Sequence, residues 1–588
     1  MELLEIRNFR GIESLTLELA PKLTLLVGRN NSGKSRVLRA LAIALGSQRA
    51  ETDDLSVDGP NTAEIDVVLA PLLIGTDGSQ RFERPVAGRL ESVQTISDQP
   101  ILERFAWRTL IIGGSKEGYG VNAERTILRR DIQQNTWIDS SEPLGDRGNI
   151  IAAGLVETNR DLADEIGRRG SAVRRVLDDL EITESDRTKL EADLQGLGAR
   201  IVSSSQSLDS IRQALTEVHS SIGSIGSPSI NPIPVRLEEL ARSVSIDLDD
   251  GVGKHLPMRL HGAGARSLAS LQVQGVLYDR RIGLDGPKPR AHPVSLIEEP
   301  EAHLHPQAQF ELADLLERIA GQVVVSTHSA HLASVVHPGI IRLVRQGSQP
   351  VSFTPFDENR QSPSMRDRQL FYMEDMERLR RLVERPFGEL LFASAVVLAD
   401  GACERALLPP LLKRGLGDRC SGVCVVDCGS LGQTTTVEAI IKFCRVAELE
   451  WFIYADSDTE GRNAVKRLSQ DSRPETRIIW NHPNDDGLSD AKEIEKMATE
   501  KLFLKFDSEL RQEVAVAFGY DPRSDQPLPT FLKAKKGVIG THLAQSLIAK
   551  YPWSGMKPEN WVWPKPIHRL IAKLDGVLPG GSIARIDS

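Results

Sequence analysis

The feature that most constrains the fold of this chain is a short loop that begins at Gly28 and ends at Ser35. Its sequence, GRNNSGKS, fits the phosphate-binding pattern GxxxxGK[ST]. An apolar run, Leu23–Val27, comes directly before the loop, and residues 37–45 after it have the spacing of a helix. A strand, a glycine-rich turn and a helix in this order leave backbone N–H groups pointing at an anion. The loop therefore predicts an α/β domain that holds a nucleotide at the end of one strand.

The loop also assigns roles to individual residues. We expect the backbone of Gly28, Asn31 and Gly33 to surround the phosphates. Lys34 can reach the β- and γ-phosphate oxygens, and the hydroxyl of Ser35 can hold Mg²⁺. The cofactors predicted for this part of the chain are ATP and Mg²⁺.

The composition of the chain is that of a large globular protein. Its 588 residues are enough for about three or four domains, and 40% apolar and 26% charged residues are ordinary values. A net charge of −9 argues against a basic coat for nucleic acid along the whole chain, although it is compatible with a local basic groove. No apolar run has the length of a membrane span, and the N-terminus lacks a signal-peptide pattern. We expect a cytoplasmic protein that does not contact a membrane.

All five cysteines lie between Cys403 and Cys444. The spacing of Cys420, Cys424 and Cys428 leaves a metal or cluster site open as an interpretation. The segment has no CxxC pair and no nearby histidine, and Cys424 lies in a strand-like run. We therefore favour small apolar packing residues.

Patterning along the chain predicts four segments. Residues 60–150 have strand patterns, residues 158–222 repeat apolar residues at helical spacing, and residues 235–345 resume α/β alternation. We expect an N-terminal nucleotide-binding lobe with a β insertion at 1–155, a helical arm with a linker at 156–234, a C-terminal nucleotide-binding lobe at 235–387, and a second α/β domain with a C-terminal extension at 388–588.

The helical segment at residues 158–222 has two interpretations. Its apolar series includes Leu190, Leu197, Ile201 and Ile211, and it is broken near residues 183–185 and 203–205. One interpretation is a projecting arm or dimerisation element, and the other is a helical subdomain that packs on its own chain. We favour the arm.

Motifs that could complete a nucleotide site lie far downstream of the loop. Gly262, Gly264 and Ser267 open a helix-like run at residues 268–277, which makes them a candidate anion site at a helix N-terminus.

An acidic strand end follows about 30 residues later in the same α/β pattern. There an apolar strand ends in Glu298 and Glu299, and one carboxylate beside a P-loop can organise Mg²⁺ while a second positions the attacking water. The next apolar strand is followed by His328, which could contact the γ-phosphate. His303 and His305 also suggest a metal pair, but the proline-rich turn around them favours a structural loop.

The order of these motifs resembles the ABC-type ATPases of the SMC and RecF group, in particular the OLD (overcoming lysogenization defect) family and its AAA_15-like relatives. Residues 298–306, EEPEAHLHP, are similar to the Walker B and D-loop region of that group. The resemblance implies that Glu298 holds Mg²⁺, that Glu299 is the catalytic base, and that His328 is a switch histidine. It also implies that residues 262–267 contact ATP bound to a second subunit. We therefore expect a homodimer or a higher homo-oligomer.

Carboxylates follow two strand patterns in the C-terminal segment. One strand is followed by Asp400, with Glu404 one turn into the next helix, and another is followed by Asp456 and Asp458. The carboxyl ends of neighbouring parallel strands meet at one sheet edge. Such a concentration of negative charge needs cations, and Mg²⁺ or Mn²⁺ accepts oxygen ligands of this kind.

This arrangement resembles the Toprim domain of topoisomerases, primases and OLD nucleases. The resemblance implies an acidic residue after the first strand, a glycine after the second (here Gly429) and a DxD motif after the third. One departure is Asp400, where the family normally has Glu; the shorter side chain puts full nuclease activity in doubt.

OLD nucleases also carry downstream acidic residues and a lysine that complete a two-metal site. The resemblance makes Glu493, Glu495 and Lys536 the candidates for these roles. Two alternatives stay open: residues 492–496 as a solvated helix face, and Asp490 as the acidic position.

Trp553, Trp561 and Trp563 lie among basic residues near the C-terminus. Aromatic residues interleaved with basic ones can line a nucleic-acid path, whereas tryptophans beside prolines pack against cores just as often. Both interpretations stay open.

The resemblance covers the whole chain: an α/β, ABC-type P-loop ATPase head with an inserted β region and helical arm, followed by a Toprim (Rossmann-like) domain. It implies an ATP-hydrolysing, metal-dependent DNA endonuclease of the OLD type with a place in bacterial defence against phage. One alternative is an SMC- or RecF-like DNA-binding ATPase whose Toprim domain does not cut. Another is a nuclease effector that needs a second protein of the same operon.

Overall fold

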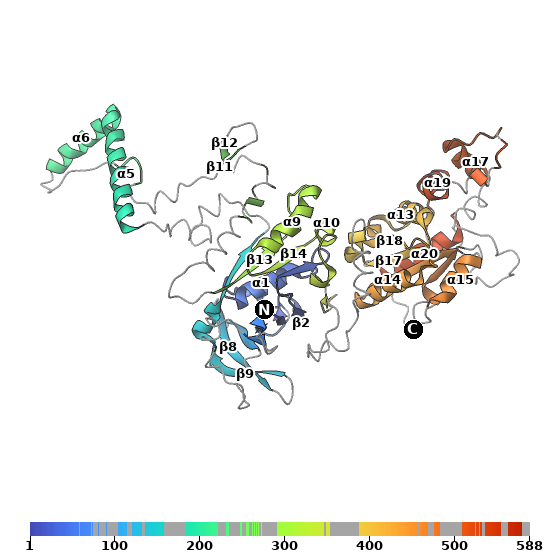
Figure 1. The fold of residues 1–588 in the computed structure, drawn as a ribbon, viewed down its shortest axis with the longest axis horizontal. Helices are drawn as coiled ribbons and strands as arrows, with labels where there is room; N and C mark the ends of the chain where they lie inside the picture. Colours follow the sequence, from blue (N-terminus) through green and yellow to red (C-terminus); the bar gives the residue numbers. More distant parts are fainter. Residues whose placement is uncertain are drawn as a thin grey trace. The chain divides into compact units, whose positions relative to one another are not determined.

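The computed structural model describes most of the chain, and its helices and strands are named as in Figure 1. Among the described residues, no helix combines the length and the apolar character that a membrane crossing needs. The described residues are 1–57, 59–71, 73–74, 80–81, 90, 104–114, 120–131, 136–157, 183–221, 231–234, 247–249, 255–257, 262, 264, 266, 268–269, 272, 291–345, 349–352, 387–456, 459–468, 475–481, 508–523, 525–527, 530–531, 535–553, 555 and 563–578.

The first six-stranded sheet has the strand order β2-β1-β4-β7-β8-β9, and its pairs from β1 to β9 are antiparallel. Strands β4, β7 and β8 confirm the strand patterns predicted within residues 60–150. Leu4 and Ile6 on β1 are fully buried and alternate with polar residues, so one face of the sheet belongs to the core. The strands are β1 (Leu3–Phe9), β2 (Ile12–Glu18), β4 (Thr62–Leu69), β7 (Phe105–Gly113), β8 (Val121–Asp131) and β9 (Thr136–Pro143).

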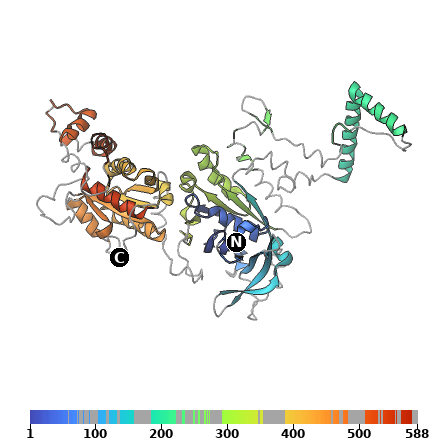
Figure 2. The same cartoon turned by 180° about the vertical axis from the view of Figure 1, so that it is seen from behind.

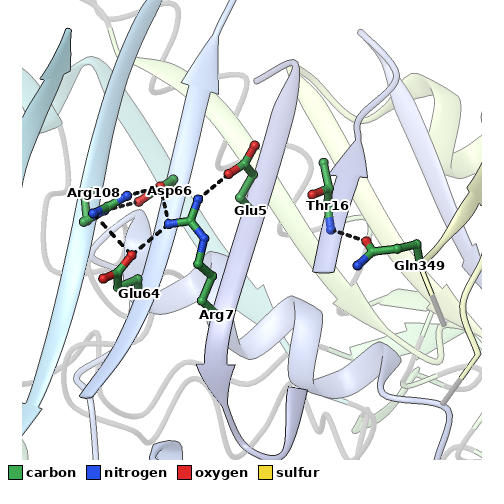
Figure 3. Close-up of polar contacts among 7 residues, drawn as sticks. All are labelled: Glu5, Arg7, Thr16, Glu64, Asp66, Arg108 and Gln349. Atoms are coloured by element: carbon green, nitrogen blue, oxygen red, sulfur yellow. Dashed lines mark hydrogen bonds and ion pairs between the residues drawn. The ribbon is translucent and has the colours of Figure 1, made fainter. Parts of the chain in front are cut away.

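Charged side chains join three neighbouring strands of this sheet (Figure 3). Arg7 on β1 donates to Glu64 at 2.8 Å and to Asp66 at 3.2 Å, both on β4. Arg108 on β7 donates to both carboxylate oxygens of Asp66 at 2.8 Å. The hydrogen bond to Asp66 raises the pKa of the Arg108 guanidinium above its ordinary value. Asp66 and Glu64 are therefore shared by both arginines, and Asp66 is the more buried of the two carboxylates.

The second six-stranded sheet follows the predicted P-loop strand and has the order β10-β13-β14-β3-β15-β16. The pairs β10–β13, β13–β14 and β3–β15 are parallel. Every residue of β3 and β14 is buried, as expected for strands covered on both faces. Strands from both sides of the long insertion thus share one sheet, which confirms the α/β class. The strands are β3 (Leu23–Val27), β10 (Ile151–Val156), β13 (His292–Glu298), β14 (Gln322–Thr327), β15 (Ile341–Leu343) and β16 (Val351–Ser352).

Three helices follow strands of this sheet in the chain, α1 (Lys34–Ala44), α9 (Pro306–Arg318) and α10 (Ala330–Ala333). Helix α1 begins at Lys34, three residues earlier than the predicted run at 37–45, because the loop turns directly into the helix. The start of α1 therefore lies next to the phosphate-binding pattern.

Helices α5 (Glu184–Ser204) and α6 (Gln206–Ser221) belong to the segment predicted as an arm. The side chain of Thr183 accepts a hydrogen bond from the Asp186 N–H and caps α5, and Ser205 ends it. These boundaries confirm the breaks predicted near 183–185 and 203–205, whereas residues 158–182 lie outside the described residues. The choice between a projecting arm and a packed subdomain stays a prediction. The exposed apolar side chains of the two helices are Leu190, Leu197, Ile201 and Ile211.

The C-terminal part contains a four-stranded parallel sheet in the order β18-β17-β19-β20. Leu407 and Leu411 on α13 pack with Leu543 on α19 and Ile571 on α20 in a buried core, and Figure 2 shows these helices from behind. Alternation of strands and helices confirms a second α/β fold. Its elements include β17 (Ala395–Ala399), α13 (Ala402–Leu416), β18 (Val423–Asp427), α14 (Thr434–Val446), β19 (Glu450–Asp456), α15 (Thr459–Arg467), β20 (Ile478–Asn481), α17 (Ser508–Ala517), α19 (Lys536–Lys550) and α20 (Lys565–Val577).

Candidate nucleotide and metal sites

The loop between β3 and α1 has the backbone shape of a phosphate cradle. Asn31 and Gly33 adopt left-handed conformations, with φ of 62° and 104°. A Cβ atom at Gly28 would lie 2.3 Å from the Val344 carbonyl oxygen, so only glycine fits there. The first turn of α1 carries no acidic residue, and its N–H groups favour a bound anion. These features agree with the predicted phosphate site.

Lys34 is buried within its own loop. Its Nζ donates to the carbonyl oxygens of Gly28 at 2.8 Å and of Arg29 at 3.0 Å. The same atom lies 3.4 Å from Nδ1 of His328, which follows β14. A cavity beside the loop is lined in part by residues 28–32 and His328. The structure therefore brings the predicted switch histidine to the predicted phosphate-binding lysine.

Glu298 and Glu299 lie where β13 ends. Parallel pairing places Glu298 opposite Ser326 on β14, and the Glu299 N–H donates to the Ser326 carbonyl oxygen at 2.9 Å. Glu299 has a φ of 42°, a left-handed conformation that strains a residue with a side chain. Backbone strain of this kind is concentrated at functional sites. Strand β13 ends at these carboxylates, and its neighbour in the sheet is β14, the strand that precedes His328.

His305 caps helix α9. Its Nδ1 accepts a hydrogen bond from the Gln307 N–H at 3.2 Å. Within the described ranges, no group of three or more His, Cys, Asp or Glu is arranged to hold a metal. The capping role of His305 agrees with the interpretation of this turn as a structural loop.

The predicted signature segment is described in part. The N–H of Arg266 donates to the Gly262 carbonyl oxygen at 3.2 Å, as at the start of a helix. A Cβ atom at Gly264 would lie 2.8 Å from the His303 carbonyl oxygen, so this glycine allows the segment to approach the turn after β13. Ser267 lies outside the described residues.

Asp400, Glu404 and Asp456 lie at the carboxyl edge of the C-terminal sheet. Asp400 follows β17, and Asp456 ends the neighbouring strand β19. Glu404, in the first turn of α13, is 1% exposed and Asp456 is 4% exposed. The Asp400 Oδ1 accepts a hydrogen bond from the Leu431 N–H at 2.7 Å. Burying carboxylates is costly unless hydrogen bonds or cations compensate.

The remaining residues predicted for this site are less fully described. Asp458, Asp490, Glu493 and Glu495 lie outside the described residues. Lys536 is the first residue of α19, and nothing further is described for its side chain. The three carboxylates that are described fit a hard divalent cation such as Mg²⁺ or Mn²⁺ by their ligand chemistry. The described residues alone, without Asp458, Glu493 and Glu495, do not form a group of three side chains arranged to hold a metal ion.

Sequence reasoning missed Asn481, the last residue of β20. Its Nδ2 donates to Oδ1 of Asp456 at 3.2 Å, and its side chain is fully buried. The sequence did contain a signal for Asn481. An apolar run comes directly before it, just as an apolar run comes directly before Asp456.

Two family models match the chain. Residues 1–71 and 159–333 match the family described as AAA ATPase domain. Residues 391–458 match the family described as Overcoming lysogenization defect protein-like, TOPRIM domain. The chain therefore combines an AAA ATPase domain with an OLD-like Toprim domain. Its ATPase and Toprim domains imply the use of a nucleotide and of a divalent metal.

The chain is similar to other proteins over most of its length. The OLD nuclease of Thermus scotoductus is 24% identical, over 77% of this chain and 81% of its own length. The Old nuclease of Escherichia phage P2 is 22% identical, over 74% of each chain. The uncharacterized protein YbjD of Escherichia coli is 25% identical, over 81% of this chain and 83% of its own.

The five cysteines of the chain are free thiols, and Cys403, Cys428 and Cys444 are buried. Burial raises the pKa of Cys424 to about 11, and it raises the pKa of Cys428 still further. The burial of three of the thiols agrees with the packing interpretation.

Two of the C-terminal tryptophans, Trp553 and Trp563, belong to or pack against the core. Trp563 is 2% exposed, and its indole N–H donates to the Tyr551 carbonyl oxygen at 2.7 Å. Trp553 stacks on His568 with ring centroids 4.6 Å apart. Core packing accounts for Trp563, and Trp561 lies outside the described residues.

Proposed function

We propose that this OLD-type chain is an ATP-dependent nuclease that cuts DNA with the help of divalent metal ions. The observation that carries the proposal is the acidic edge of the C-terminal sheet, where Asp400, Glu404 and Asp456 come from neighbouring elements. Carboxylates at such an edge hold the metal ions used in phosphodiester cleavage. The Toprim match and the names of two relatives, both OLD nucleases, support the same activity.

In the proposed nuclease site, acidic residues bind Mg²⁺ or Mn²⁺ through oxygen atoms. Bound there, the ions supply Lewis-acid chemistry, since they lower the pKa of a bound water and offset phosphate charge. Lys536 binds the scissile phosphate and offsets charge that develops on it. The residues that we assign to metal binding are Asp400, Glu404, Asp456, Asp458, Glu493 and Glu495.

We assign ATP and Mg²⁺ to the P-loop site. Lys34 exchanges the two loop carbonyls that it now contacts for β- and γ-phosphate oxygens. Ser35 and Glu298 hold Mg²⁺, Glu299 orients the attacking water, and His328 contacts the γ-phosphate. Backbone N–H groups of Gly28, Asn31 and Gly33 bind the remaining phosphate oxygens.

The proposed ATPase works as a homodimer or a higher homo-oligomer. Gly262, Gly264 and Ser267 would reach ATP bound to a second copy of the chain and complete its site. We place the protein in the cytoplasm, where its DNA target would include phage DNA and where a second protein of the same operon could regulate it.

A second candidate function is a DNA-binding ATPase whose Toprim domain does not cut. Asp400 favours it, because this side chain is one methylene shorter than the expected Glu and one of its oxygens already accepts the Leu431 N–H. Asp400→Glu separates the two functions: a gain of cutting in the variant over an inert wild type would favour the binding module.

Cleavage of supercoiled plasmid tests the nuclease proposal. With Mg²⁺ or Mn²⁺ we expect nicking by the wild type, and we expect Asp456→Ala to slow it by at least about 100-fold, because the variant loses a metal ligand. Asp525→Ala, at an exposed position of the same domain, is the matched control and should cut normally. Parallel reactions with and without ATP, on the wild type and Lys34→Ala, report how the nucleotide controls cutting. An inert wild type, or nicking that Asp456→Ala leaves unchanged, would contradict the proposal.

A further inference from the structure

The strand β20 places a buried amide beside a buried carboxylate. Strands β19 and β20 are parallel, and their register sets Asp456 directly opposite Asn481. The two residues are 4% and 0% exposed. They are far apart in the sequence, so the pairing of the strand ends alone brings them together.

The contact between them has a defined polarity. Asn481 Nδ2 donates to Asp456 Oδ1 at 3.2 Å. An ionised carboxylate only accepts hydrogen bonds, so the amide must turn its NH₂ group, and not its carbonyl oxygen, towards Asp456. Donation to an ionised carboxylate gives a stronger bond than donation to a neutral acceptor.

The end of β19 also lies close to helix α15. Gly461 on α15 lies so close that a Cβ atom there would come 2.3 Å from the Asp456 carbonyl oxygen and 3.2 Å from its Cβ. The backbone of Asp456 therefore lies close to α15, and its side chain accepts a hydrogen bond from Asn481. The hydrogen bond from Asn481 uses one of the two carboxylate oxygens, which is how metal-binding carboxylates are commonly oriented.

We propose that Asn481 is a positioning residue that orients the carboxylate of Asp456 for a divalent cation. This inference rests on the proposed metal site at Asp456. Asn481 acts through Asp456, and it holds the carboxylate in one orientation before the cation arrives. A residue that only filled space at this position could be replaced by an apolar side chain of similar size without loss of metal affinity.

Titration of the full-length protein with Mn²⁺ in the absence of nucleotide tests the inference, because it measures binding without turnover. Asp456→Ala first defines which part of the binding signal belongs to this site. Asn481→Leu keeps the branched shape and the number of heavy atoms of the side chain and removes the donor, and we expect it to weaken that signal by about 10-fold or more. Asn463→Ala, an exposed amide on α15, is the matched control and should bind as the wild type does.

Thermal unfolding of the metal-free proteins accompanies the titration. If Asn481→Leu loses its folding transition, Asn481→Ala removes the same donor without burying an apolar side chain, and the same loss of affinity is expected. Wild-type affinity in a folded Asn481 variant, with the signal lost in Asp456→Ala, would overturn the positioning role and leave the metal site in place. A signal that Asp456→Ala does not change would overturn the proposed metal site, and the positioning role with it.

Discussion

At the scale of single residues, His568 illustrates how burial decides protonation in the C-terminal core. Its side chain is 1% exposed and stacks on Trp553. The backbone N–H of Trp563 donates to Nε2 of His568 at 3.2 Å, so this nitrogen carries no proton. Burial lowers the pKa of His568 to about 4. The folded protein therefore holds a neutral imidazole.

We predict that this histidine makes the C-terminal core less stable as the pH falls from about 6.5 to about 4. In this window the unfolded chain binds more protons than the folded chain, so stability rises with pH and is lost on acidification. Urea unfolding followed by tryptophan fluorescence should show a smaller acid loss for His568→Gln than for the wild type. The exposed His331→Gln is the control and should keep the wild-type dependence. An equal acid loss in His568→Gln would contradict the prediction.

At the scale of elements, the first sheet depends on one carboxylate shared by three strands. The Asp66 side chain is 5% exposed, and it accepts hydrogen bonds from Arg7 on β1 and Arg108 on β7. A buried pair of charges stabilises the fold little more than apolar side chains in the same place would. Removal of one partner nevertheless lowers the stability of the fold, because the other charge loses its compensation. Asp66 therefore matters mainly through the two arginines that it leaves behind when it is removed.

We predict that Asp66→Ala lowers the free energy of unfolding by about 1–3 kcal/mol, because Arg7 and Arg108 lose their buried acceptor and keep only the more exposed Glu64 as a common partner. Glu5→Ala removes a half-exposed partner of Arg7 and should cost less than about 1 kcal/mol. Urea denaturation of both variants measures the difference. Equal effects would mean that the buried carboxylate has no special part in joining the strands.

At the scale of the whole molecule, the segment of α5 and α6 separates strands that share one sheet. Strand β10 precedes the segment and β13 follows it, and the two pair in parallel. The segment itself exposes apolar side chains, with Leu197 at 47% and Ile211 at 51%. Apolar residues that recur on exposed helices mark a contact surface more often than isolated ones do. A second copy of the chain is the partner that we predict.

We predict that Leu197→Glu combined with Ile211→Glu reduces the oligomer size measured by light scattering, since charges would be buried in the contact between arms. Asp193→Ala on α5, the helix that carries Leu197, is the control. It should keep the wild-type oligomer size, because an exposed polar side chain adds no apolar area to the contact. An unchanged size in the double variant would favour the packed subdomain instead of the arm.

Much of the fold was predictable because its signals are local. The P-loop pattern depends on backbone conformations that suit Gly33 and Asn31 and on the close approach that requires Gly28. The carboxylates of Asp400 and Asp456 follow apolar runs, so the chain order alone indicates that they end strands. These properties belong to a few consecutive residues, and the sequence contains them without reference to the rest of the molecule.

The sequence by itself determined two α/β folds, a phosphate loop and a set of acidic strand ends. Only the tertiary structure decided which side chains meet: Lys34 with His328, and Asp456 with Asn481. The physical reason is that strand order and register are set by burial of whole strands, a sum over many residues that no local pattern contains. The phosphate loop was therefore predictable from eight consecutive residues, and His328 was predicted near the same phosphate, whereas nothing in the sequence indicated that Asn481 contacts Asp456.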